Sequence, residues 1–225
     1  MRSLASYQAL DLLALEHARK LHRRLHAVRC GGVTQTWTEL LYANTSDFGA
    51  YASSAVEGSL LTPGPKTQPV IPATYFEKTI GRSISIVARG VLSVTGTPTI
   101  IFQARLGTTQ GSTFLSGTSV GVSAAITTIV GVTNKWWELR LDLTCDTIGQ
   151  GTGNTILSGS GYVASPGGFA SPFVYPLEPT TPDTATWTAT IDDAITQYLN
   201  LSATWSANSA SNTITVKQLL AYGLN

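Results

Sequence analysis

The chain has 225 residues, a net charge of +1 and only 12% charged residues, so it can bury a core of its own but lacks the broad basic face of a nucleic-acid binder. Its two cysteines, Cys30 and Cys145, form neither a disulfide framework nor a zinc cluster, and we expect both to be free thiols. No apolar run approaches the ~18 residues of a membrane span, and Asp11 and Glu16 interrupt the apolar part of any secretion signal.

Residues 3–29 are predicted to form an amphipathic helix. The stretch 17–30 holds five basic residues and all three histidines, and Arg19, Lys20 and Arg23 lie mostly off the apolar stripe. The stripe follows three- and four-residue spacing through Leu10, Leu13, Ala14, His17, Leu21, Leu25 and Val28. The sequence CGG at 30–32 predicts a helix end and a hinge. We therefore divide the chain into a helical element, 1–32, and a body, 33–225.

After the hinge the hydrophobic period changes to two, which is typical of half-buried β-strands. In the segment 135–146, one face carries Trp137, Leu139, Leu141, Leu143 and Cys145, and the other carries polar residues. Further strands are expected at 33–43, 82–94, 99–106, 154–164, 184–191, 194–206 and 212–222, with Ile195 among the inward residues of 194–206. Gly-, Asn- and Ser-rich turns separate them, so the body is predicted to be an all-β antiparallel sandwich or barrel.

Two long proline-containing stretches, 44–74 and 165–183, are predicted to be loops or edge segments. The second contains large apolar residues, which favours contact over disorder. Two interpretations stay open: the loop folds back over its own core, or it lies at contacts between copies of the chain. The candidates for such oligomer contacts are Phe169, Phe173, Tyr175 and Leu177.

Three segments carry a resemblance to a known group of proteins: IPATYFEKTIGRSISIVARGVLSVTGTPTIIFQARLGTT (71–109), WWELRLDLTCDTIGQGTGNTILSGSGY (136–162) and TIDDAITQYLNLSATWSANSASNTITVKQLLAY (190–222). The chain resembles the single jelly-roll structural proteins of tailed-bacteriophage virions over about residues 70–222. The resemblance implies a jelly-roll β-sandwich with a non-enzymatic virion role, as a head decoration protein, a fibre or a tail-tip component. It does not extend to residues 1–32.

The body offers little material for catalysis. No histidine follows His26, so neither an inward metal site nor a Ser-His-Asp triad can be built there. In the helix, His22 and His26 could form only a weak metal pair, and we expect no metal or cofactor. The carboxylates Asp142, Asp146, Asp192 and Asp193 are interpreted as surface or turn residues rather than a glycosidase pair. Trp136 points opposite to Trp137 and is either packed at a strand edge or a platform for stacking on a sugar.

The helix is interpreted as a docking element, because a one-sided apolar stripe must be covered by something. It could anchor the protein on another virion protein, bundle with copies of itself, or touch packaged nucleic acid. Six cations give only modest phosphate neutralisation, so direct nucleic-acid binding is not expected. The predicted partner-docking residues are Leu10, Leu13, His17, Arg19, Lys20, Leu21, Arg23, Arg24, Leu25 and Val28.

The leading hypothesis is therefore a non-enzymatic capsid decoration protein, anchored through its N-terminal helix. It would assemble in the host cytoplasm, form a trimer or another cyclic homo-oligomer, contact virion proteins such as the major capsid protein, and have no membrane contact. The alternative hypothesis is a tail-associated, fibre or receptor-binding module that contacts host glycan.

Overall fold

The computed structural model describes residues 38–52, 54–61, 68–78, 80–110, 115–149, 154–179 and 187–224. The expected N-terminal helix, its hinge and all ten predicted docking residues lie outside these ranges. Within them, no helix is long and apolar enough to cross a membrane. In chain order the elements are β1 (Thr38–Asn44), β2 (Ala50–Ala52), β3 (Gly58–Ser59), β4 (Val70–Ile71), the 3-10 helix η1 (Phe76–Lys78), β5 (Ser83–Ser93), β6 (Thr99–Gly107), β7 (Thr118–Ser123), β8 (Ile126–Thr127), β9 (Lys135–Thr147), β10 (Thr155–Ala164), β11 (Val174–Glu178), β12 (Thr188–Ile191), β13 (Gln197–Trp205) and β14 (Thr213–Leu224).

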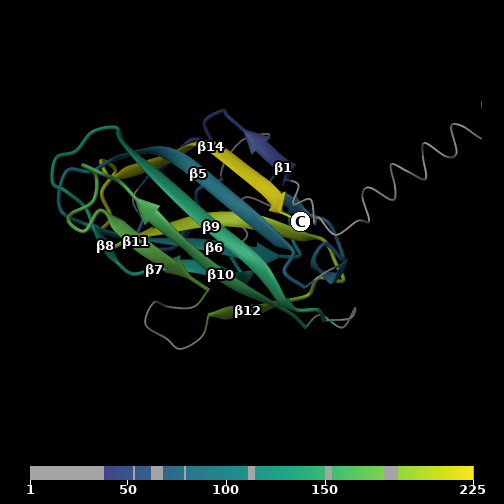
Figure 1. Ribbon diagram of the computed structural model, residues 1–225. Helices are drawn as coiled ribbons and strands as arrows, with labels where there is room; N and C mark the ends of the chain where they lie inside the picture. The colour runs from purple at the N-terminus through teal and green to yellow at the C-terminus, as the bar shows by residue number, and fades with distance from the viewer. Residues whose placement is uncertain are drawn as a thin grey trace, which may run out of the picture. The chain divides into compact units, whose positions relative to one another are not determined.

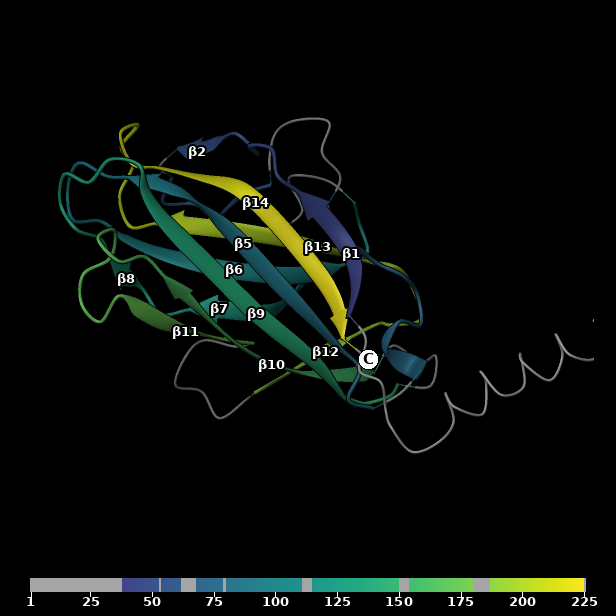
Figure 2. The ribbon, with the colours of Figure 1, turned by 45° about the horizontal axis from the view of Figure 1, so that its top comes forward.

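The described strands pair antiparallel in one continuous sheet, in the order β1–β14–β5–β9–β10–β11–β7–β6–β13–β3. The sheet folds over on itself, so that β14, β5 and β9 form one layer and β6 and β13 lie behind them in the other (Figure 1, Figure 2). The last two strands of the chain lie in different layers, because β13 pairs with β6 whereas β14 lies between β1 and β5. The all-β antiparallel sandwich predicted from the period-two patterns is confirmed.

The core lies between the two layers and follows the predicted alternation. On β9, Trp137, Leu139, Leu141, Leu143 and Cys145 are all buried. The intervening residues of this strand are exposed or half-buried. Because successive strand residues point to opposite faces, one run of alternating sequence was enough to identify the inward side.

Aromatic rings join the layers at one place in the core. The Phe102 ring of β6 lies 5.2 Å from the Trp137 ring of β9, centroid to centroid. Phe169 packs edge-on against Phe102 at 6.1 Å and against Tyr175 at 6.1 Å. The segment after β10 is therefore fastened to the core by its own aromatic side chains.

The stretch 165–183, predicted to be a loop or an edge segment, is partly a paired strand inside the sheet. Part of it forms β11, which pairs with β10 along residues 161–164 and with β7 only at Leu177 and Glu178. Pro176 is tolerated because it lies where β7 does not pair with β11, so its missing N–H leaves the β7 ladder intact. The folded-back interpretation holds for Phe169 and Leu177, which are fully buried in the core of this chain and have no surface left for another copy.

Candidate ligand-binding groove beside β12

The carboxylates singled out from the sequence do not gather into a catalytic pair on β9. Asp142 and Asp146 lie on its outer face. The Arg140 side chain lies 3.4 Å from Asp142, between Nε and Oδ2, and the Ser158 hydroxyl donates a hydrogen bond to Asp146 at 3.0 Å. Both acids therefore have the surface roles expected of them.

The consecutive acids after β12 have different surroundings. Asp193 is buried, and its Oδ2 accepts hydrogen bonds from the backbone N–H groups of Phe76 at 2.8 Å and Glu77 at 3.0 Å. Asp193 thus caps the first turn of η1, where backbone donors would otherwise be unsatisfied. Asp192 is half-buried, and its Oδ1 accepts a hydrogen bond from Ala194 N at 3.1 Å. Of the two described hollows, the smaller has Asp192 in its lining, and neither has Asp193.

The described part of the chain contains no candidate metal site, and its cysteine is buried. No group of three or more His, Cys, Asp and Glu side chains is placed there to hold a metal ion. Cys145 is a free, buried thiol on the inner face of β9, and burial raises its pKa above the ordinary value. Cys30 and the three histidines lie outside the described residues.

A groove opens where two strands share one edge of β10. Residues 155–158 of β10 pair with β12, whereas residues 161–164 pair with β11. β11 continues the sheet to β7 and β6, whereas β12 pairs with β10 and lies near β7 without pairing with it. The space between β12 and the outer face of β6 and β7 forms a hollow of about 460 Å³.

The lining of this groove combines the hydroxyl groups of Ser and Thr residues and the amide of Gln103 with apolar surface. None of the lining residues that the structure describes carries a charge. Hydroxyls both donate and accept hydrogen bonds, so such a surface matches a ligand that also presents hydroxyls in both roles. The lining residues are Gln103, Thr118, Ser119, Val122, Pro179, Thr188, Ala189 and Thr190.

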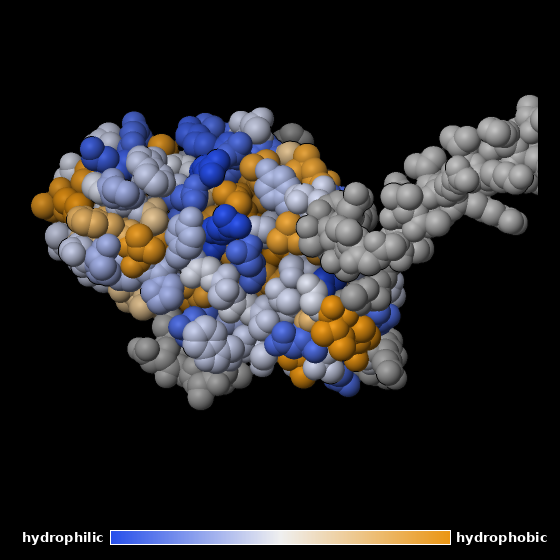
Figure 3. Space-filling view, in the orientation of Figure 1, coloured by the Kyte–Doolittle hydropathy of each residue, from blue (hydrophilic) through white to orange (hydrophobic). Residues whose placement is uncertain are grey.

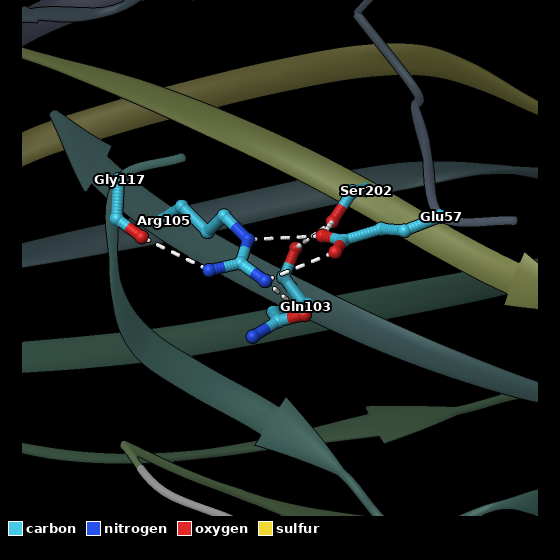
Figure 4. A network of polar contacts seen from close by, with 5 residues as sticks. All are labelled: Glu57, Gln103, Arg105, Gly117 and Ser202. Atoms are coloured by element: carbon cyan, nitrogen blue, oxygen red, sulfur yellow. Dashed lines mark hydrogen bonds and ion pairs between the residues drawn. The ribbon is translucent and has the colours of Figure 1, made fainter. Parts of the chain in front are cut away.

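Gln103 has a fixed orientation at the floor of the groove. Arg105 Nη2 donates a hydrogen bond to Gln103 Oε1 at 3.0 Å. A guanidinium group has donors only, so the amide oxygen must face Arg105 and the amide NH₂ must point the other way. Figure 4 shows the amide nitrogen directed away from the guanidinium. Gln103 thus presents two donors in a defined direction.

Arg105 is itself held by a partly buried ion pair. Its Nε and Nη2 donate to the two carboxylate oxygens of Glu57, both at 2.9 Å, and its Nη1 donates to Gly117 O at 2.9 Å (Figure 4). The Ser202 hydroxyl donates to the same carboxylate. Burial by itself raises the pKa of Glu57, but the hydrogen bonds from Arg105 and Ser202 hold it below its ordinary value. The pair is therefore charged at neutral pH, and it fixes the guanidinium that orients Gln103.

A second hollow, of about 280 Å³, continues the groove past the end of β12. The two hollows share Thr118 and Thr190, so they adjoin. The second is more polar and contains one charged lining residue, Asp192. Its other lining residues are Leu106, Gly107, Thr108, Thr109, Ser116, Gly117, Ile191 and Gln197.

Two tryptophans are exposed, and they belong to different places. Trp187 directly precedes Thr188 of the groove wall, is 60% exposed, and accepts a hydrogen bond from Gly159 N through its carbonyl at 3.3 Å. Trp136 is 52% exposed but lies on β9, where it pairs with Val91 of β5 in the same layer, away from β12. The sequence interpretation singled out Trp136 and missed Trp187, whose signal was an aromatic residue at the start of a threonine-rich strand.

The surface near Trp136 is apolar at one end of the sandwich. Ser165 ties two segments together there, because its Oγ donates to Trp136 O at 2.6 Å and its N–H donates to Phe173 O at 3.1 Å. Phe173 and Val174 are exposed, whereas Tyr175 is half-buried. Apolar surface occurs in separate patches between polar ones on the face seen in Figure 3. Contact of Phe173 with another copy of the chain stays a prediction.

No family model and no curated protein matches this chain. Among solved structures, it is similar to the CBM2 module of the evolved Dit of Lactobacillus casei BL23 phage J-1, with 10% identity, a TM-score of 0.34, and coverage of 85% of this chain and 98% of the other. It is also similar to peanut lectin bound to a 9mer peptide, with 10% identity, a TM-score of 0.33 and coverage of 85% and 99%. A third likeness is to the alginate lyase Aly36B in complex with an alginate trisaccharide, with 9% identity, a TM-score of 0.28 and coverage of 84% and 97%. Likenesses this low carry no argument about function.

Proposed function

We propose that the chain is a non-catalytic β-sandwich module of a tailed-phage virion that binds carbohydrate in the groove beside β12. The observation that carries the proposal is the lining by described residues that are uncharged and half of which bear hydroxyls, with the amide of Gln103 oriented by Arg105. A carbohydrate presents many hydroxyl groups, and each one that is buried on binding needs a hydrogen-bond donor or acceptor from the protein. A buried hydroxyl without such a partner would weaken binding.

The neighbourhood of the groove supports the same ligand class. Trp187 is an exposed aromatic surface next to the groove wall, and an aromatic face can stack on the apolar face of a sugar ring. Among the lining residues that the structure describes in both hollows, Asp192 is the one carboxylate, whereas glycoside hydrolysis ordinarily uses a pair. These features favour binding without turnover.

A glycan-binding groove favours the tail-associated alternative over capsid decoration. A decoration protein needs a docking element for the capsid, and the candidate for that element lies in residues 1–32, outside the described part of the chain. A receptor-binding module needs a ligand site on its body, and the groove is such a site. The proposal is therefore a tail or fibre module that contacts host glycan.

The binding site is tested with the full chain on a glycan array, followed by calorimetry on the glycans retained. Gln103→Ala should weaken binding about tenfold, the equivalent of one net hydrogen bond to the ligand. Gln218→Ala is the matched control, because Gln218 also accepts a hydrogen bond from an arginine, Arg89, but does not line either hollow. If the Gln103→Ala variant and the wild type bound glycan with equal affinity, the groove beside Gln103 would not be the binding site.

The location is tested on purified virions. Quantitative gel densitometry should find few copies per particle, and free protein added to host cells should block adsorption. Many copies per particle, together with unstable capsids when the protein is omitted, would support decoration instead.

A further inference from the structure

The two adjoining hollows differ in charge, and this difference bears on which carbohydrate the groove accepts. Resting on the function proposed above, we infer that the groove binds a linear, uncharged oligosaccharide across two consecutive subsites, and that Asp192 excludes acidic sugars. The first subsite is the hollow beside Gln103 and Thr188, and the second is the hollow beside Asp192 and Gln197.

The two hollows together span more than the width of one sugar ring. Thr188 lines the first subsite and Asp192 the second, four residues apart along an extended segment that begins with β12. At about 3.3 Å per strand residue, this separation is roughly 13 Å, which exceeds the width of one pyranose ring. Thr118 and Thr190 line both subsites, so a chain passing from one to the other stays in contact with hydroxyl groups.

The charges around the groove discriminate against anions. Among the described residues that line the two subsites, Asp192 is the one with a charged side chain, and a carboxylate can only accept hydrogen bonds. A neutral sugar satisfies it with a hydroxyl donor, whereas a uronic or sialic acid brings a second negative charge near it. Asp192 has its Oδ1 engaged by Ala194 N, which keeps the carboxylate in place at the end of β12.

The arginine that holds Gln103 is not free to compensate for this charge. Arg105 is the arginine below the first subsite, and both of its forked donors are directed at Glu57 at 2.9 Å. An acidic sugar would have to break this bidentate pair to gain a positive partner, leaving Glu57 partly buried and unpaired. The pair thus orients Gln103 without offering a positive charge to the ligand.

The test uses the full chain and an array of neutral, uronic-acid and sialic-acid glycans from one to six sugar residues long, followed by calorimetry. Affinity for neutral glycans should rise with length from a monosaccharide to a short oligosaccharide. Acidic counterparts should bind about tenfold more weakly. Asp192→Asn should narrow this difference, and Asp146→Asn, at an exposed carboxylate outside the groove, should leave it unchanged. Asn can still accept the hydrogen bond from Ala194, so the variant keeps the local turn.

Thr118→Val provides an independent variant, because it removes a hydroxyl shared by both subsites and keeps the side-chain shape. This variant should lower the affinity for oligosaccharides several-fold more than the affinity for monosaccharides. Equal affinity for neutral and acidic glycans, or no gain with length, would overturn this inference while leaving the proposed function intact. If no glycan of any class binds, the proposed function itself fails.

Discussion

The Trp137 ring on β9 packs against the Phe102 ring on β6, with centroids 5.2 Å apart and planes inclined at 49°. This contact joins two strands that belong to opposite layers of the sandwich and are not hydrogen-bonded neighbours. Phe169 extends the contact at 6.1 Å from Phe102, so the segment after β10 depends on the same cluster.

Trp137→Ala should therefore destabilise the fold strongly. Removal of a fully buried aromatic side chain loses its burial and leaves a cavity, at a cost of about 3–5 kcal/mol in the free energy of unfolding. The neighbouring Trp136→Ala is a matched control, because that side chain is 52% exposed and its removal should cost less than about 1 kcal/mol. Urea denaturation of both variants measures the difference, and similar losses would contradict the assigned faces of β9.

Breaking the ion pair between Arg105 and Glu57 should lower stability and disturb the groove. Both side chains are mostly buried, so Arg105→Met leaves an unpaired carboxylate and should cost about 1–3 kcal/mol. The same variant frees Gln103 to rotate and should weaken glycan binding. A double-mutant cycle with Glu57→Gln isolates the pair, and additive losses would show that the two side chains do not interact.

The same pair predicts part of the acid sensitivity of the protein. The pKa of Glu57 is depressed in the folded state, so its contribution to stability is complete above the unfolded pKa and is lost as the pH falls through the folded pKa. Wild type and Glu57→Gln should therefore differ most near neutral pH and converge in acid. Denaturation curves at a series of pH values measure this, and a difference that grows in acid would be inconsistent with the ion pair.

Asp193 should show the opposite pH dependence. Burial raises its pKa to about 6 from 3.8, and its Oδ1 has no hydrogen-bond partner in the described structure. The folded protein thus binds this proton more tightly than the unfolded chain, and stability is lost as the pH rises through the folded pKa. Asp193→Asn can still accept a hydrogen bond from Phe76 or Glu77 through its amide oxygen.

The free energy of unfolding of Asp193→Asn, relative to that of the wild type, should increase by about 2–3 kcal/mol from pH 4 to pH 7. This is the equivalent of a shift of roughly two pKa units. Chemical denaturation at the two pH values gives this difference directly. Parallel pH profiles for the variant and the wild type would show that Asp193 ionises without cost in the fold.

Cys145 should be unreactive in the native protein. The thiol is buried on the inner face of β9 and its pKa is raised, so little thiolate forms and reagents cannot reach it. In a Cys30→Ser variant, a thiol reagent such as DTNB should label no cysteine until denaturant is added. Rapid labelling of this variant under native conditions would mean that the β9 core opens readily.

The sequence determined those features that depend on neighbouring residues. The alternation in 135–146 predicted the buried face of β9, because successive side chains of a strand point to opposite faces regardless of what the strand pairs with. Turn residues likewise indicated most of the long strands. The predicted inward position of Ile195 is wrong for a local reason: β13 begins at Gln197, and Ile195 lies exposed in the preceding turn.

Only the tertiary structure decided the groove and the fate of the proline-rich stretch. Gln103, Thr118 and Thr188 meet because β10 shares one edge between β11 and β12, a pairing that no local pattern encodes. Phe169 and Phe173 have the same side chain, four residues apart, yet one is buried in the core and the other is exposed. Strand pairing and layer packing are long-range, so a single sequence specifies which residues can be inside but not which distant residues become neighbours.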